Sequence, residues 1–156
     1  MYKKILLPLD GSPNSECILA HVKEIASGCK VPEVVALFVV EPIRASQTFD
    51  IPEGYLEEAR NKNLAQAEDY VSGIADNLKK NGISATAEVI QGKAADSILD
   101  YARDNEVDLI LISTHGRSGV SRWALGSVAD RVIRQSLVPV LSVAPPGCRL
   151  SDSRVQ

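Results

Sequence analysis

Residues 108–128 read DLILISTHGRSGVSRWALGSV, and this stretch contains the unit from which the whole chain is built. The aliphatic run from Asp108 to Ser113 predicts a β-strand that is covered on both faces. A loop rich in glycine and serine follows, and the apolar spacing over 127–135 predicts a helix. A buried strand that leads through a loop into a helix is typical of a βα unit on a parallel sheet.

The same alternation of apolar runs and amphipathic stretches extends to both ends of the chain. Because crossovers between parallel strands are almost always right-handed, it predicts an α/β fold: an open five-stranded parallel sheet, doubly wound and Rossmann-like, with helices on both faces. The predicted strands are Lys4–Leu9, Val34–Val40, Thr86–Ile90, Asp108–Ser113 and Val138–Val143. The predicted helices run from Pro13 to Gly28, through Leu64–Leu78, from Ala94 to Arg103 and from Ser127 to Gln135.

Helix capping and apolar spacing predict how the first and last helices lie on the sheet. Ser12 is suited to cap the first helix, with Pro13 in its first turn. Apolar residues three or four positions apart share one helix face, and we expect that face to contact the core. These residues are Ile18, Val22 and Ile25 in the first helix and Val128, Val132 and Ile133 in the last.

The length and composition of the chain predict a single folded domain. With 156 residues, of which 45% are hydrophobic and 24% are charged, the chain can bury a core of its own. We expect one domain over residues 1–144. The polar segment 145–156 opens with Pro145-Pro146-Gly147, and we expect it to be a flexible tail.

Charge, cysteine spacing and hydropathy argue against several classes of function. The formal net charge of −3 disfavours nucleic acid as a partner, because binding a phosphate backbone calls for a basic face. Cys17, Cys29 and Cys148 have no metal-binding spacing, so we expect no metal held by protein side chains. No apolar run approaches the roughly 20 residues that span a membrane, and the first residues do not form a signal peptide. We therefore expect a cytoplasmic protein without a membrane partner.

Polar residues end two strands that the sheet is expected to bring together. In doubly wound sheets, ligands bind at the carboxyl ends of the strands, where the strand order reverses. The first strand ends in Pro8-Leu9-Asp10, and the fourth leads into Ser113–Gly116. If these two strands flank the reversal, both ends share one crevice.

The loop after the fourth strand has the composition of an anion-binding site. Glycine lets backbone N–H groups approach an anion, and the helix that opens at Gly126 offers unpaired N–H donors and a positive dipole end. Ser127 could cap that helix or donate its hydroxyl to the anion. Arg117 and Arg122 add positive charge that suits phosphate. The alternative, that glycine and serine serve only to turn the chain, stays open.

The spacing of the loop residues also resembles a known motif. Gly116, nine intervening residues, Gly126 and Ser127 match the later part of G-x-x-G-x9-G-[S/T], with Ser113 in place of the first glycine. Together with the opening KKILLPLDGS of residues 3–12, this makes the chain similar to the universal stress protein family from about Lys3 to Val143. The resemblance implies a fold of the adenine nucleotide alpha hydrolase-like type and ATP as the ligand, with Mg²⁺ or Mn²⁺ held by its phosphates.

The resemblance also implies roles for individual residues. Pro8, Leu9 and Asp10 would border the base and ribose, and Val39 would touch the adenine. Ser113, His115 and Gly116 would lie along the ribose and phosphates, and Gly126, Ser127 and Val128 would present N–H groups to the phosphates. The full set of candidate nucleotide-binding residues is Pro8, Leu9, Asp10, Val39, Ile112, Ser113, His115, Gly116, Arg117, Arg122, Gly126, Ser127 and Val128.

Several alternatives stay open at this point. The chain contains neither a Walker-type GxxxxGK[ST] loop nor a GxGxxG after its first strand. It could be a slow ATP-hydrolysing enzyme, with turnover well below about 10 per second, or a protein-interaction module in which Ser113 blocks the nucleotide. Asp10 could serve only to turn the chain, and His115 only to orient the loop.

The last strand is expected to be an association surface. Residues 138–143 carry no charge, and an uncovered edge strand tends to pair with another chain. The simplest cover is the same strand of a second copy, and the family resemblance also implies a homodimer. The expected interface residues are Val138, Val140, Leu141 and Val143. We therefore expect a dimeric stress-response sensor or regulator, for which a further protein partner stays open.

Overall fold

The computed structural model describes residues 1–42, 53–116 and 125–145. Strands and helices alternate along the chain, as the sequence predicts. In order, the elements are β1 (Lys4–Leu9), α1 (Pro13–Glu16), α2 (Leu19–Gly28), β2 (Glu33–Val40), α3 (Glu53–Lys80), β3 (Ala85–Gln91), α4 (Ala94–Asp104), β4 (Leu109–Ser113), α5 (Ser127–Gln135) and β5 (Val140–Val143).

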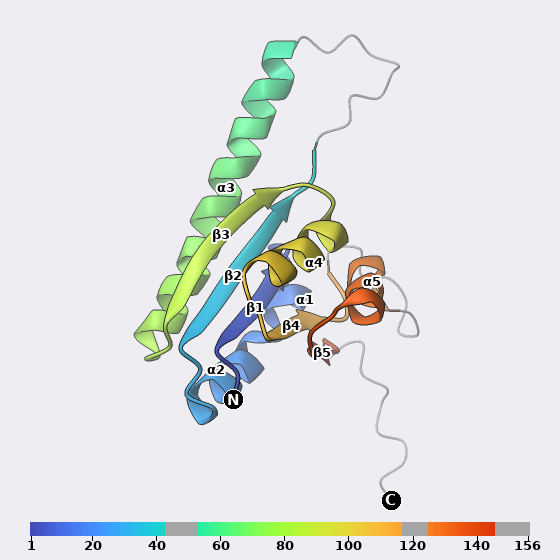
Figure 1. Ribbon diagram of the computed structural model, residues 1–156. Coiled ribbons are helices and arrows are strands. Elements are labelled where there is room, and N and C mark those ends of the chain that lie inside the picture. The colour runs from blue at the N-terminus through green and yellow to red at the C-terminus, as the bar shows by residue number, and fades with distance from the viewer. Residues whose placement is uncertain (43–52, 117–124, 146–156) are drawn as a thin grey trace, which may run out of the picture.

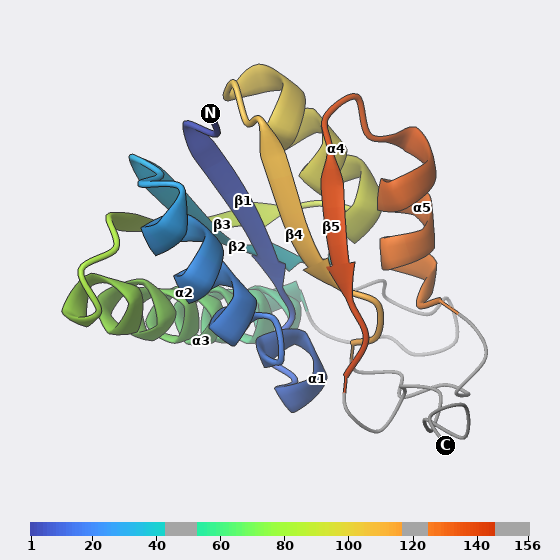
Figure 2. The same cartoon turned by 90° about the horizontal axis from the view of Figure 1, so that it is seen from below.

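The strands form one parallel five-stranded sheet in the order β3-β2-β1-β4-β5. Helices α1, α2 and α3 cover one face of the sheet, and α4 and α5 cover the other (Figure 2). The order reverses between β1 and β4, so the chain builds outward from the centre in both directions. The predicted doubly wound α/β fold is confirmed, and the carboxyl ends of β1 and β4 lie side by side at the reversal.

The core is split by the sheet into two apolar layers. Because successive side chains of a strand point to opposite faces, Ile5 and Leu7 pack with α2 and α3, whereas Leu6 packs with α4 and α5. All three of these residues have no exposed surface. This burial on both faces explains why the strands read as continuous aliphatic runs.

The first predicted helix is interrupted. Ser12 caps α1 as predicted, and its hydroxyl oxygen accepts a hydrogen bond from the N–H of Ser15 at 3.2 Å. The helix ends at Glu16 and starts again at Leu19, because Cys17 adopts backbone angles close to those of a 3₁₀ turn (φ −57°, ψ −20°). The core face is as expected at Ile18 and Val22, which are fully buried, and Ile25 is partly buried.

The last helix and strand differ from the prediction in two places. Helix α5 has the predicted bounds. Ile133, which was expected to face the core, is 38% exposed, and the buried residues of the helix are Ala129 and Val132. Ala129 and Val132 are three residues apart and share the inner face of the helix. Ile133 therefore lies at the edge of that face. Strand β5 begins at Val140 and not at Val138, which lies in the turn that follows α5.

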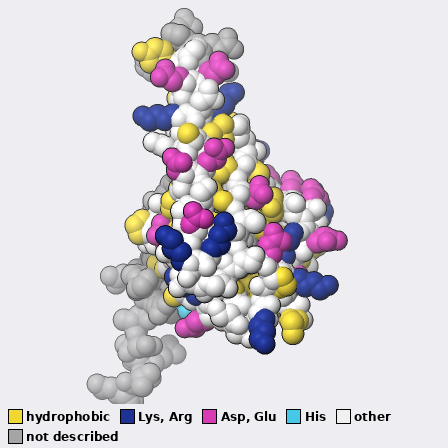
Figure 3. All heavy atoms as spheres, turned by 90° about the vertical axis from the view of Figure 1, so that its left-hand side faces the viewer, with side chains coloured by type: hydrophobic (Ala, Val, Ile, Leu, Met, Phe, Trp, Pro, Cys, Tyr) yellow, Lys and Arg dark blue, Asp and Glu magenta, His cyan; other side chains and the backbone are white. Residues whose placement is uncertain are grey.

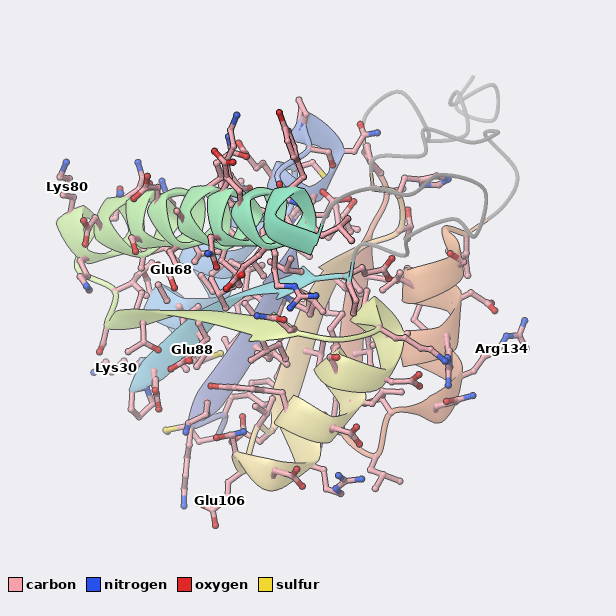
Figure 4. The ribbon with its side chains drawn as sticks, turned by 90° about the horizontal axis from the view of Figure 1, so that it is seen from above. Lys30, Glu68, Lys80, Glu88, Glu106 and Arg134 are labelled. Carbon is pink, nitrogen blue, oxygen red and sulfur yellow. The ribbon has the colours of Figure 1, made fainter. Side chains whose placement is uncertain are left out.

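Helix α3 is much longer than the strands that it covers. Its buried stripe comprises Ala67, Val71, Ala75 and Leu78, all in its carboxyl-terminal half. The amino-terminal part extends past the carboxyl ends of β2 and β3 (Figure 1), and charged side chains mark its outer surface (Figure 3). Figure 4 shows Glu68 and Lys80 on this helix, on the side of the sheet away from Arg134 of α5. Despite its length, neither α3 nor any other described helix is apolar enough to cross a membrane.

Candidate functional site

A pocket of about 680 Å³ opens at the carboxyl ends of β1, β2 and β4. The amino-terminal ends of α4 and α5 and one side of α3 complete its wall. Most of the sequence-predicted site residues line it: Pro8, Leu9, Asp10, Val39, Ile112, Ser113, His115, Gly116, Gly126, Ser127 and Val128. Arg117 and Arg122 lie outside the described residues. Residues from both halves of the chain therefore converge at the point where the strand order reverses.

Asp10 holds the turn after β1 and also faces the pocket. Its Oδ1 accepts hydrogen bonds from the N–H of Ser12 at 2.9 Å and from the Ser12 hydroxyl at 2.6 Å. Its Oδ2 lies against Gly116, where a Cβ would collide with it. Asp10 thus both holds the turn and lines the pocket, so the two roles considered from sequence are compatible.

Residues 113–116, the strand-end loop, are fixed by hydrogen bonds to three other parts of the chain. The carbonyl of Thr114 accepts from the N–H of Gly126 at 2.8 Å, at the start of α5. The carbonyl of Gly116 accepts from Asn14 Nδ2 at 3.2 Å, and the Thr114 N–H donates to the carbonyl of Val143 at 2.9 Å. The loop therefore has a defined shape and presents Gly116 to the pocket without a side chain.

His115 combines burial with an unsatisfied ring nitrogen. The residue is 7% exposed, and its Nδ1 lies 2.8 Å from the hydroxyl oxygen of Thr114, which is equally buried. Its Nε2 has no hydrogen-bond partner among the described residues. A buried polar atom without a partner is costly, so Nε2 is a destabilising feature of this otherwise hydrogen-bonded loop.

The amino-terminal end of α5 supplies backbone donors to the same pocket. Gly126 is the N-cap, and it has no side chain to bond the first-turn N–H groups. Ser127 is the first helical residue and not the cap. Its side chain is exposed and does not cap the helix. Unpaired N–H groups and the positive dipole end together make such a helix start suitable for a phosphate when further donors converge on it.

Helix α3 contributes pocket residues that are not predicted from the sequence. Asn63, Gln66 and Tyr70 line the wall opposite α4. They follow one another at three- and four-residue spacing, so they share the helix face that continues into the buried stripe. The sequence does contain a signal for these residues, because they are polar and lie next to the apolar stripe at helical spacing. This signal indicates a pocket only once the position of α3 is known.

Tyr70 and Glu41, both in the pocket wall, are held by specific contacts. The Tyr70 hydroxyl donates to Glu16 Oε1 at 2.9 Å, and its ring packs edge-on against Phe38 with centroids 5.9 Å apart. Burial and, after it, the Glu16 hydrogen bond and charge raise the pKa of Tyr70 above its ordinary value. Glu41, a second lining carboxylate, accepts from the N–H of Ala94 at the start of α4 at 3.2 Å.

Comparison with known proteins identifies the family. The model of the universal stress protein family matches residues 1–144. The chain belongs to the universal stress protein family. It is 32% identical to universal stress protein MJ0577 of Methanocaldococcus jannaschii over 92% of this chain and 95% of that protein. The solved structure of MJ0577 superposes with a TM-score of 0.81 over 93% of this chain and 97% of the other.

More distant universal stress proteins share the fold and have been solved with adenine nucleotides. One is a complex with cAMP, at a TM-score of 0.67 and 21% identity, covering 91% of this chain and 97% of that one. Another is a family member from Arabidopsis thaliana with AMP bound, at a TM-score of 0.67 and 18% identity, covering 96% and 97% of the two chains. Adenine nucleotides therefore bind to proteins of this fold.

Proposed function

We propose that this universal stress protein binds ATP in the pocket at the carboxyl ends of β1 and β4 and acts as a dimeric sensor or regulator. The observation that carries the proposal is the convergence of the uncapped start of α5, the strand-end loop and Asp10 on one pocket of about 680 Å³. The AMP and cAMP complexes of two relatives with this fold support an adenine nucleotide as the ligand.

The placement of the donors suggests how the nucleotide lies. The phosphates would meet the first-turn N–H groups of α5 at Ser127 and Val128, where the helix dipole favours negative charge. The ribose hydroxyls would donate to Asp10 Oδ2, and the base would reach Val39 at the end of β2. The residues described contain no cluster of three metal-ligating side chains. In this proposal Mg²⁺ or Mn²⁺ is held by the phosphates themselves.

Binding without rapid hydrolysis fits the carboxylates of the pocket. Asp10 and Glu41 both line it, and both accept hydrogen bonds from backbone N–H groups at the start of a helix, Ser12 at α1 and Ala94 at α4. A general base for phosphoryl transfer needs a carboxylate positioned toward the attacking hydroxyl or water. We therefore expect ATP turnover well below the enzyme median of about 10 per second.

The proposed homodimer pairs β5 of one protomer with β5 of the other. Strand β5 forms an edge of the sheet, and large apolar side chains in the segment that leads into it are exposed: Ile133 of α5 at 38% and Leu137 at 89%. Leu125, which precedes α5, is 46% exposed. Val143 is buried within the protomer, so this part of the strand would contribute its backbone edge. A two-fold axis would then join the two sheets edge to edge.

A thermal-shift titration of nucleotide-free protein tests the binding proposal. ATP, AMP and GTP are each titrated with and without Mg²⁺. A ligand at about 100 times its Kd adds about 2.7 kcal/mol to the native state, which raises the Tm of a domain of this size by about 5–10 °C. We expect this shift with ATP and a much smaller one with GTP. The absence of any saturable shift with adenine nucleotides would overturn the proposal.

A further inference from the structure

The Ser113 hydroxyl is built into the strand-end loop. Ser113 ends β4 and is 6% exposed. Its Oγ donates to the carbonyl of His115 at 2.9 Å and lies 3.4 Å from the N–H of the same residue, which donates to it. One hydroxyl thus bonds both the backbone carbonyl and the backbone N–H of His115, two residues further along the chain.

The same hydroxyl connects the loop to the junction between α1 and α2. Cys17 Sγ lies 3.6 Å from Ser113 Oγ. A serine hydroxyl has a single hydrogen, and the shorter contact to the His115 carbonyl takes it. The Cys17 thiol is therefore the donor in the longer contact. Ser113 Oγ accepts from two groups and donates to a third, which leaves it fully used inside the protein.

These contacts fix the peptide that directly precedes Gly116. Gly116 packs against Asp10 Oδ2 so closely that no Cβ fits between them. A rotation of the His115 peptide would move Gly116 and open this contact. Holding a binding loop in its bound shape before the ligand arrives lowers the entropy lost on binding.

We propose that Ser113 is a positioning residue for the nucleotide pocket, and this inference rests on the proposed function. Its hydroxyl does not occupy the ligand's place, because it is turned into the loop by its bonds to His115 and Cys17. It holds the loop so that Gly116, His115 and Asp10 keep the arrangement that receives the ribose and phosphates. Removing the hydroxyl should therefore weaken nucleotide binding by more than its effect on stability explains.

The chain contains a matched control for this test. Ser136, after α5, makes the same pattern of bonds: its Oγ donates to the carbonyl of Val138 at 2.7 Å and accepts from the N–H of Val138 at 3.2 Å. Ser136 does not line the pocket. Ser136→Ala therefore removes an equivalent pair of hydrogen bonds from a turn that the ligand does not touch.

The experiment compares Ser113→Ala, Ser136→Ala and the unaltered full-length protein. The Kd for ATP is measured by equilibrium dialysis, and the free energy of unfolding is measured by urea denaturation. We expect both variants to be destabilised, and Ser113→Ala by more than Ser136→Ala, since Ser113 is buried and also loses its contact with Cys17. Only Ser113→Ala should raise the Kd, by about three- to tenfold, whereas Ser136→Ala should change it less than about twofold. Amide exchange at His115 should also become faster in Ser113→Ala without ligand.

Equal Kd values for the unaltered protein and Ser113→Ala would overturn the positioning role while leaving the proposed function intact. Failure of the unaltered protein to bind ATP would overturn the proposed function, and this inference with it. If Ser113→Ala does not fold, Ser113→Thr and Ser113→Val decide the question, because these side chains have the same shape and differ in the hydroxyl. The threonine variant should then bind ATP about three- to tenfold more tightly than the valine variant, and equal binding would contradict the proposal.

Discussion

At the scale of single residues, Asp10 and Gly116 define the centre of the candidate site. Asp10 uses one carboxylate oxygen to hold the turn and directs the other toward Gly116. Each of these two tasks responds differently to substitution, so each can be measured separately.

Asp10→Asn should separate the turn from the ligand contact. The asparagine Oδ1 can accept the same hydrogen bonds from Ser12, so the free energy of unfolding should change by less than about 0.5 kcal/mol. Its NH₂ group cannot accept from the ribose hydroxyls, so the Kd for ATP should rise about tenfold. Asp10→Ala should lose both affinity and about 1–2 kcal/mol of stability. Unchanged ATP affinity in Asp10→Asn, measured by equilibrium dialysis, would show that Asp10 does not contact the ligand.

Gly116→Ala should damage the pocket by a steric effect. The added Cβ collides with Asp10 Oδ2, so either the loop or the carboxylate must move. We expect the Kd for ATP to rise more than about tenfold and the stability to fall by about 1–3 kcal/mol. Gly73→Ala in α3 is the control, because no atom lies within 4 Å of its added Cβ. It should stabilise the protein by about 0.5–1 kcal/mol and bind ATP normally, whereas normal binding by Gly116→Ala would refute the close approach.

At the scale of elements, α3 and α1 are joined at the pocket wall by Tyr70 and Glu16. The hydrogen bond between them is made by the protonated phenol, and burial together with the nearby carboxylate raises the Tyr70 pKa. An unfolded tyrosine ionises near pH 10. The stabilisation is therefore complete below about pH 10 and is lost as the pH rises above it, since the unfolded chain releases its proton first.

Tyr70→Phe should flatten the alkaline part of the stability profile. At pH 8 the variant should be less stable than the unaltered protein by about 1–2 kcal/mol, because a hydrogen bond to a charged group is lost. Between pH 8 and pH 11 that difference should shrink by about 1 kcal/mol. Urea denaturation at both pH values measures it. A difference that stays constant or widens would contradict the assigned role of the phenol.

The elements also show how far the sequence could lead. Strands β1, β2 and β4 could be predicted because each is buried on both faces and so reads as an aliphatic run. The alternation of strands and helices predicted the doubly wound class, whereas the adjacency of β1 and β4 entered only as a condition, which the structure meets. The break between α1 and α2 at Cys17 could not be predicted, since the segments on both sides of it have helical periodicity. The pocket residues Asn63 and Gln66 could not either, because their role depends on where α3 lies against strands distant in sequence.

At the scale of the whole molecule, the proposed dimer depends on the free edge of β5. Ser142 is an exposed residue of this strand, and Thr86 is an exposed residue of β3 at the opposite edge. A glutamate in a two-fold strand pairing brings like charges together and opposes association. Ser142→Glu should therefore shift the protein to monomers at micromolar concentration, and Thr86→Glu should remain dimeric. Light scattering measures the molar mass of each variant. A monomeric unaltered protein would contradict the proposed dimer.

The whole site assembles elements from both halves of the sheet around one proposed nucleotide. The measurement that tests this most directly is equilibrium dialysis of nucleotide-free protein against labelled ATP, with unlabelled GTP as competitor. The account predicts saturation at one ATP per chain, and competition by GTP that is at least about tenfold weaker than by unlabelled ATP, or about 1.4 kcal/mol. An absence of saturable binding, or equal competition by both nucleotides, would contradict it.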